Sequence, residues 1–258
     1  MMSDIQTITS PESEENEVKR HSIKDQWTKL VAVASLVAIA LGSFNDSVDA
    51  LEKIYQFSLS QFTDIPSQSK LEKVYVRASS NVLDEVMGAP VYIKRSSSGA
   101  IIKYYQDSRF ILSAITQDES IAAFLVFPVD NFQPDTTKSS GGSQLLNRAF
   151  SAQEDVSDLR ANLSRIATYY VEENAGGEFG NLYASVSGFS QFEQDMSANS
   201  RNDLDRLVDG IMLGEDVTAV AQKLRQDLVP NFFGYSTLAL YELEEAILSK
   251  SEYQLIRP

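Results

Sequence analysis

Few residue types in this chain can carry out nucleophilic or acid–base chemistry. The 258 residues include no cysteine and a single histidine, His21, which lies in a polar N-terminal stretch. The usual serine, cysteine and zinc hydrolases need an imidazole or a thiolate, so the composition excludes them beyond residue 21. An enzyme with this sequence would have to use carboxylates, tyrosine, lysine or a serine–lysine pair.

One acidic cluster could act on glycosidic bonds. Glu172, Glu173 and Glu178 lie together in a short stretch that also contains Gly176 and Gly177. Two carboxylates held about 5–10 Å apart in a cleft can act as acid and base in glycoside hydrolysis. Acidic, glycine-rich turns also keep the tips of hairpins soluble, and we favour this second interpretation.

A serine–lysine motif is present near the start of the second quarter of the chain. Ser67 and Lys70 fit the S-x-x-K pattern, in which lysine can deprotonate serine for acyl transfer. Residues 79–81 read Ser-Ser-Asn, like a second motif of penicillin-recognising enzymes, but no Lys-Thr-Gly sequence follows them. We therefore interpret the segment after Pro66 as a polar turn.

We expect no metal and no cofactor. The acidic run from Asp203 to Gly210 hints at a calcium loop. With Gly210 as the loop glycine, however, Leu207 would occupy the third ligand position, so a solvated acidic helix face is the better interpretation. Residues 138–143 lack the residue order of a phosphate-binding loop and are interpreted as a flexible loop.

The charge balance limits the possible partners. Aspartate and glutamate total 36 against 22 lysines and arginines, which gives a formal net charge of −14. Nucleic acid requires a concentrated basic face, so we exclude it as a partner. The expected partners are a membrane and either another protein or a second copy of the chain.

An apolar run predicts a membrane anchor. Residues 30–44 are apolar all round the helical wheel apart from two serines and Gly42, and Trp27 stands just before them. Fifteen residues rise only about 22 Å, but a helix over residues 27–48 could cross about 30 Å of hydrocarbon. We expect an uncleaved transmembrane signal anchor; a buried core helix and a cleaved signal peptide are the alternatives.

The flanking charges predict the orientation of the anchor. The N-terminal side of the apolar run carries four basic residues, Lys19, Arg20, Lys24 and Lys29, and the C-terminal side carries only Lys53 among Asp46, Asp49 and Glu52. The positive-inside rule then places the N-terminus in the cytoplasm and the C-terminal domain in the periplasm, as a single-pass protein of a bacterial inner membrane. Ala34, Ala38 and Gly42 follow one stripe of this helix, so we expect the anchor to self-associate.

The expected fold class is α+β, an antiparallel four-stranded meander packed with helices and preceded by one N-terminal transmembrane helix. The meander strands are Pro90–Arg95, Ala100–Gln106, Arg109–Thr116 and Ser120–Val129, which polar turns separate. The expected parts are a disordered cytoplasmic tail (1–26), the anchor (27–48), a juxtamembrane helix (49–62) and a soluble α+β domain (63–258) with a possible subdivision at 133–152.

Further elements are expected after the meander. Apolar spacing predicts a helix over 156–166, a hairpin of Thr168–Val171 with Asn181–Ser187, helices over Asp203–Met212 and Asp216–Leu228, and a last helix over Ser236–Leu248. Gly88 and Pro90 predict the end of a helix within residues 70–87. Phe232, Phe233 and Tyr235 are a candidate docking patch, although we favour their burial in a core.

The order of elements resembles uncharacterised single-pass bacterial inner-membrane protein families of the enterobacterial and prophage type. The shared features are a basic-flanked anchor, Gly88-Ala89-Pro90, the meander, and the Pro230–Gly234 segment. The order of helix, Gly-x-Pro and hairpin is also similar to that of small envelope assembly lipoproteins, but the lipid-bearing cysteine is missing. The resemblance implies no particular site residues.

These observations predict a membrane-tethered envelope protein with a non-enzymatic binding or accessory domain, acting as a sensor or assembly factor. One alternative is a carboxylate-dependent hydrolase of envelope glycan that uses Glu172, Glu173 or Glu178. The other alternative, a phage-defence or immunity component, rests on the resemblance alone. No cofactor is required by any of the three.

Overall fold

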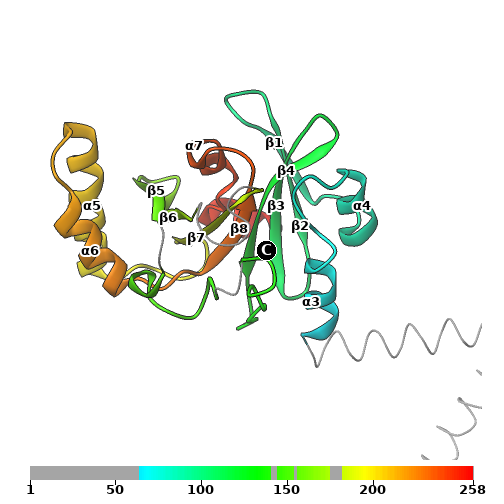
Figure 1. Ribbon diagram of the computed structural model, residues 1–258, viewed down its shortest axis with the longest axis horizontal. Coiled ribbons are helices and arrows are strands. Elements are labelled where there is room, and N and C mark those ends of the chain that lie inside the picture. Colours follow the sequence, from blue (N-terminus) through cyan, green and yellow to red (C-terminus); the bar gives the residue numbers. More distant parts are fainter. Residues whose placement is uncertain (1–63, 141–143, 154–155, 175–181, 258) are drawn as a thin grey trace, which may run out of the picture. The chain divides into compact units, whose positions relative to one another are not determined.

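The computed structural model describes residues 64–140, 144–153, 156–174 and 182–257. They form an α+β unit around one eight-stranded antiparallel sheet with the strand order β1-β2-β3-β4-β8-β7-β6-β5 (Figure 1). The expected tail, anchor and juxtamembrane helix all lie outside these residues. Within the described ranges, no helix combines the length and the apolar character that a membrane crossing needs.

The first half of the sheet contains the four expected strand segments. They are β1 (Tyr92–Arg95), β2 (Ile101–Gln106), β3 (Phe110–Gln117) and β4 (Ser120–Pro128), joined as an antiparallel meander. Asp118 and Glu119 connect β3 to β4 with φ angles of 47° and 61°. Positive φ at both central residues matches the twist of a two-residue hairpin, so these four strand predictions are confirmed.

The expectation of a four-stranded sheet is wrong, because the meander is only half of the observed sheet. The other strands are β5 (Val156–Leu163), β6 (Thr168–Asn174), β7 (Ala184–Ser190) and β8 (Phe232–Ser236). Strand β8 pairs with β4 on one side and with β7 on the other, so it joins the meander to the second group of strands. The expected hairpin is confirmed as β6 and β7, which pair with each other in the same sheet.

Two of the expected helices are wrong. The segment expected as a helix over 156–166 forms β5, whose residues pair along β6, for example Arg160 with Val171. Pairing with a neighbouring strand outweighs the local helical spacing. The last expected helix, Ser236–Leu248, is also absent as such, because Ser236 ends β8 and only the short α7 (Leu240–Leu243) and a 3₁₀ turn (Glu244–Ala246) follow.

The remaining helices flank the sheet. They are α3 (Ile65–Leu71), α4 (Asn81–Met87), α5 (Ala198–Leu213), α6 (Thr218–Asp227) and α8 (Lys250–Ile256), with a 3₁₀ turn at Phe150–Ala152. Helix α4 ends at Gly88, whose φ of 81° confirms the predicted helix stop. The two helices predicted near the C-terminus are confirmed as α5 and α6.

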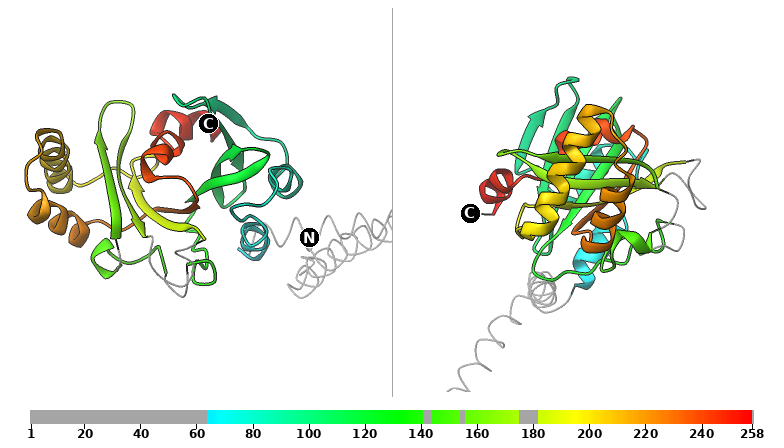
Figure 2. Two further views of the ribbon diagram at one scale, coloured as in Figure 1. Left: turned by 45° about the horizontal axis from the view of Figure 1, so that its top comes forward. Right: turned by 90° about the vertical axis from the view of Figure 1, so that its left-hand side faces the viewer.

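The core has a layer on each face of the sheet. On one face, Phe127, Phe232 and Val186 from both halves pack under Leu243 and Leu248 of the C-terminal segment. The opposite face is divided. Helices α3 and α4 with the following loops cover β2–β4, whereas α5 and α6 cover β6 and β7, and Figures 1 and 2 show these helix pairs at opposite ends of the unit.

Two glycines allow β8 to sit between the halves. A Cβ at Gly188 would lie 2.0 Å from the ring of Phe232, and a Cβ at Gly234 would lie 2.3 Å from the carbonyl oxygen of Phe124. Both distances are far shorter than van der Waals contact, so a side chain at either position would push the central strands apart. The junction between the two halves therefore requires residues without side chains.

Candidate functional site

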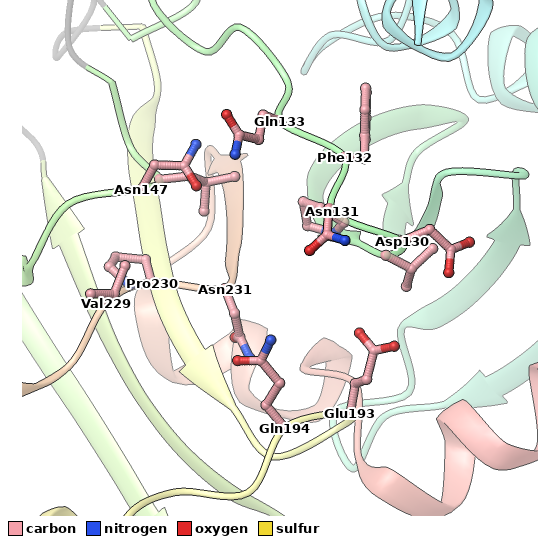
Figure 3. Close-up of a pocket in the computed structure, with 13 residues that line it drawn as sticks. Asp130, Asn131, Phe132, Gln133, Asn147, Glu193, Gln194, Val229, Pro230 and Asn231 are labelled. Carbon is pink, nitrogen blue, oxygen red and sulfur yellow. The ribbon is translucent and has the colours of Figure 1, made fainter. Parts of the chain in front are cut away.

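A pocket of about 440 Å³ lies at the end of the sheet where β4 and β7 finish and β8 begins (Figure 3). This volume is within the range of about 300–1,000 Å³ that is typical of small-molecule sites. Four segments form its wall, two of them from the connection between β4 and β5, and the lining residues are Pro128, Val129, Asp130, Asn131, Phe132, Gln133, Leu146, Asn147, Glu193, Gln194, Val229, Pro230 and Asn231. The pocket thus draws on both halves of the sheet.

The loop after β4 is a tight turn that presents polar side chains. The amide of Phe132 donates to the carbonyl of Val129 at 3.0 Å, and the two residues between them, Asp130 and Asn131, have φ angles of 53° and 59°. Asn147 across the pocket also has a positive φ, 65°. Aspartate and asparagine tolerate this left-handed conformation better than other residues with side chains, which explains why they occupy these positions.

Asn231 holds the loop before β8 against the end of β7. Its side-chain amide accepts from the amide of Ser190 at 2.9 Å and donates to the Ser190 carbonyl at 2.8 Å. The Asn231 backbone amide donates to the carbonyl of Gly188 at 2.9 Å. This side chain therefore extends the pairing of β7 with β8 by one position and fixes the pocket wall.

Four other amide side chains face the pocket and are exposed to solvent. Asn131, Gln133 and Asn147 gather on one side of it, and Gln194 lies on the other side beside Glu193 (Figure 3). In the part of the chain that the structure describes, none of these four amides has a hydrogen-bond partner. Each offers both donors and an acceptor to a ligand.

The two carboxylates of the pocket are already engaged. Asp130 forms an ion pair of 2.9 Å with Arg257, and Glu193 accepts a hydrogen bond of 3.1 Å from the hydroxyl of Tyr253. Burial opposes the charge of Arg257, but Asp130 outweighs burial and raises the pKa of the guanidinium. Burial and the charge of Glu193 raise the pKa of Tyr253, so its hydroxyl stays protonated and remains a donor.

Three of the apolar residues along the pocket are covered by the turn. Val129, Phe132 and Leu146 are buried beneath the turn. No lysine or arginine is among the lining residues, and the described residues contain no group of three or more acidic side chains that could hold a metal ion. The arrangement suits an uncharged ligand that presents many hydroxyl or amide groups.

The candidate docking patch is not on the surface. Phe232, Phe233 and Tyr235 are 0%, 4% and 5% exposed, because β8 is the central strand and buries both of its faces. The prediction of an exposed aromatic patch is therefore wrong for the described unit, and the alternative of a core position is what the structure shows. Trp27, Ala34, Ala38 and Gly42 lie outside the described residues.

The acidic cluster considered for glycoside hydrolysis is divided. Glu172 is fully buried under α6, where the Nε atom of Arg225 lies 2.8 Å from its carboxylate and the hydroxyl of Tyr170 donates to it. Glu173 follows it on a strand and therefore points to the opposite face of the sheet. Burial raises the pKa of Glu172, while Tyr170 and Arg225 act in the opposite direction. Glu178 lies outside the described residues.

The serine–lysine motif attaches α3 to the sheet. Ser67 is only 3% exposed and donates to Asp107 in the turn between β2 and β3, and Lys70 pairs with the other oxygen of the same carboxylate at 2.7 Å. Burial raises the pKa of Asp107, but the hydrogen bonds from Lys70, Ser67 and the Arg109 amide outweigh it and lower the pKa. This geometry is structural, since the serine is inaccessible.

The acidic run on α5 also has a structural role. Asp203 is buried and pairs with Lys223 of α6 at 2.6 Å. The interpretation of this run as a wholly solvated face is therefore wrong at Asp203, which links the two helices instead. Its neighbours Asp205 and Asp209 are exposed, as expected.

Sequence reasoning did not identify the pocket. Its residues come from four segments that are far apart in the chain, and a signal existed for only one of them: Asp130-Asn131 between two apolar residues marks a turn. Comparisons of the chain with protein-family models, with curated proteins and with solved structures found no match.

Proposed function

We propose that this chain is a membrane-tethered envelope protein whose described unit is a non-enzymatic binding domain for a neutral, hydroxyl-rich ligand of the glycan type. The observation that carries the proposal is the pocket of about 440 Å³ with four unpartnered amides, Asn131, Gln133, Asn147 and Gln194, around it. The tether rests on the apolar sequence of residues 27–48.

The chemistry of the lining favours a neutral ligand. Sugar hydroxyls are donors and acceptors, as amide side chains are, so each amide can make two complementary hydrogen bonds. The pocket carboxylates are occupied by Arg257 and Tyr253, and the described lining residues include no lysine or arginine. The turn after β4 is closed by the hydrogen bond from the Phe132 amide to the Val129 carbonyl, so the backbone at Asn131 is held with little freedom, which lowers the entropy lost on binding.

A glycan hydrolase remains a second candidate because Asp130 and Glu193 line the same pocket. Glycoside hydrolysis needs one protonated carboxyl group and one ionised partner. Here Arg257 pairs with Asp130 and the hydroxyl of Tyr253 donates to Glu193, so both carboxylates already have partners within the protein. Binding without turnover is therefore the better supported function.

The test measures binding of a neutral N-acetylhexosamine tetrasaccharide to the full-length chain by titration calorimetry. We expect saturable binding that weakens by about tenfold in the double variant Gln133→Ala with Gln194→Ala, because each lost hydrogen bond contributes about 0.5–1.5 kcal/mol. Neither residue has a positive φ, so the substitutions leave the backbone unstrained.

The control removes two amides of the same type elsewhere. Gln117→Ala with Gln222→Ala changes exposed glutamines at the end of β3 and on α6, which do not line the pocket, and binding should remain unchanged. Equal binding by the native chain and the pocket variant, or no saturation with the native chain, would contradict the proposal. Release of shorter sugars during the titration would favour the hydrolase.

A further inference from the structure

A second, smaller pocket has the opposite electrostatic character. It has a volume of about 230 Å³ and lies between the turn that joins β5 to β6, the end of β7, the start of α5 and the start of α8. Three cationic side chains line it, Arg165, Arg201 and Lys250, against one carboxylate, Asp195. It shares no lining residue with the amide-lined pocket.

This concentration of positive charge is unusual in a chain with a net charge of −14. Most described lysines and arginines form ion pairs, but Arg165 and Arg201 pair with no carboxylate among the residues that the structure describes. Lys250 lies 3.4 Å from Asp195, a long contact between exposed groups. The pocket thus has a surplus of positive charge.

The positive charge of Arg201 is unfavourable at its position in α5. Arg201 stands in the first turns of α5, next to the positive end of the helix dipole, and the first turn of α5 holds no acidic residue. A cation is disfavoured there, whereas an anion is stabilised. Residues that oppose a local preference, such as that of a helix N-terminus for negative charge, occur most often at functional sites.

The walls around the cations are rigid. Thr168, Ser190 and Ser249 are buried, and the Ser190 hydroxyl donates to the carbonyl of Leu248 at 2.7 Å. Gln191 accepts from Arg201 at 3.3 Å through its side-chain oxygen, which orients the guanidinium and leaves the Gln191 amide nitrogen as a further donor. The segments that carry the lining residues are therefore held by buried side chains and hydrogen bonds.

We propose that this pocket binds a phosphate-type oxyanion, held by Arg165, Arg201 and Lys250. Two guanidinium groups can grip a tetrahedral oxyanion through paired hydrogen bonds, and a lysine adds a third charge. A water molecule occupies about 30 Å³ in the liquid, so the pocket has room for one phosphate-sized group and several waters. The anion can be free phosphate or the phosphate of a lipid headgroup.

The experiment titrates inorganic phosphate into the full-length chain and follows binding by calorimetry at low salt. We expect saturable binding that weakens by about tenfold for each of Arg165→Gln and Arg201→Gln. Arg201→Lys keeps the positive charge but loses the planar guanidinium group, which can donate two parallel hydrogen bonds. The phosphate affinity of this variant should therefore lie between those of the native chain and Arg201→Gln. Both arginines are exposed, so the variants should fold as the native chain does, which their melting temperatures will verify.

The control variant carries Lys73→Gln and Arg95→Gln, which remove the same amount of charge from exposed, unpaired positions outside the pocket. Its phosphate affinity should equal that of the native chain. If the control weakens binding as much as the double variant Arg165→Gln with Arg201→Gln, the effect is general charge and the proposal is wrong. No saturable binding by the native chain would also overturn it.

A second arm distinguishes the two sources of the anion. Dihexanoyl phosphatidylglycerol, used below its micelle concentration, is compared with dihexanoyl phosphatidylcholine, whose headgroup is neutral overall. Tighter binding of the first lipid than of inorganic phosphate, with sensitivity to Arg201→Gln, assigns the site to lipid headgroups. Binding of inorganic phosphate alone assigns it to a soluble ligand. If the two lipids bind equally and Arg201→Gln does not change their affinity, the site does not bind lipid headgroups.

Discussion

The two halves of the sheet bury very different side chains. In the first half, β3 and β4 are buried along almost their whole length by apolar residues on both faces. In the second half, β6 carries a fully buried carboxylate, Glu172, which contacts Arg225 of α6 and the hydroxyl of Tyr170. The first half also has a buried carboxylate, Asp107, but it lies in the turn between β2 and β3, whereas Glu172 lies within a strand of the second half.

This difference should be visible in how the halves respond to mutation and to pH. Apolar burial does not change with pH, whereas a buried ion pair depends on the charge of both members. An intact buried ion pair adds little to the free energy of unfolding, because desolvation of the two charges offsets their attraction. Removal of one member lowers the free energy of unfolding much more, because the other charge is left buried without a partner. The predictions below test whether the halves differ in this way.

The largest effect is expected from Phe127→Ala in β4. Phe127 is fully buried, and its ring lies 5.0 Å from that of Phe232 and 5.5 Å from that of Phe192. Loss of a buried phenyl group should lower the free energy of unfolding by about 3–5 kcal/mol. Urea unfolding at several pH values will measure it, and a loss that changes markedly with pH would contradict the assignment to apolar packing.

Arg225→Ala should have an effect of similar size at neutral pH, also about 3–5 kcal/mol, because it leaves the Glu172 carboxylate buried without its cation. Arg225 also donates to the carbonyls of Phe150 and Gln153 at 2.9 and 2.7 Å. Unlike Phe127→Ala, the loss should shrink in acid, where Glu172 becomes protonated. The double variant with Glu172→Gln should recover part of the stability, and a loss that is the same at all pH values would argue against the ion pair.

A smaller effect is expected when two carboxyl groups are neutralised one at a time. The pKa of Glu172 is raised above its ordinary value of 4.5, so its contribution to stability is complete below pH 4.5 and is lost as the pH rises through the folded-state pKa. The free energy of unfolding of Glu172→Gln should therefore increase relative to that of the native chain as the pH rises.

Asp107 should behave in the opposite way. Its pKa is lowered below the ordinary value of 3.8, so its contribution is present above pH 3.8 and is lost as the pH falls through the folded-state pKa. The stability difference between the native chain and Asp107→Asn should therefore shrink in acid. Denaturant unfolding from pH 3 to pH 7 measures both variants, and parallel pH profiles for the two would show that the halves do not differ.

The smallest effect is expected at the edge strand β1. Ile93 is 54% exposed, and its pairing partner Lys103 lies on β2. Ile93→Thr keeps a β-branched residue and buries nothing new, so the free energy of unfolding should change by less than about 0.5 kcal/mol. Thermal unfolding will verify this. A larger loss would indicate that the edge of the first half is covered by another surface.

Much of the first half could be predicted from sequence because its pairing is local. Strands β1 to β4 follow one another through short turns, so the apolar runs and the polar residues between them already define the hairpins. The stop at Gly88 is equally local, because it depends on one residue with a positive φ. In the second half, β5 could not be predicted from the sequence. Its apolar residues Val156, Leu159 and Leu163 have helical spacing and yet form an edge strand.

The sequence by itself determined where the meander strands, the α4 stop and the α5–α6 helices lie, because each depends on residues that are neighbours in the chain. Only the tertiary structure decided that β8 enters between β4 and β7, which buries Phe232 and Phe233 and makes one sheet of eight strands. It also decided that Glu172 is buried beside Arg225, and it brought together the loops of both pockets. These features depend on contacts between residues far apart in the chain, and local spacing does not encode such contacts.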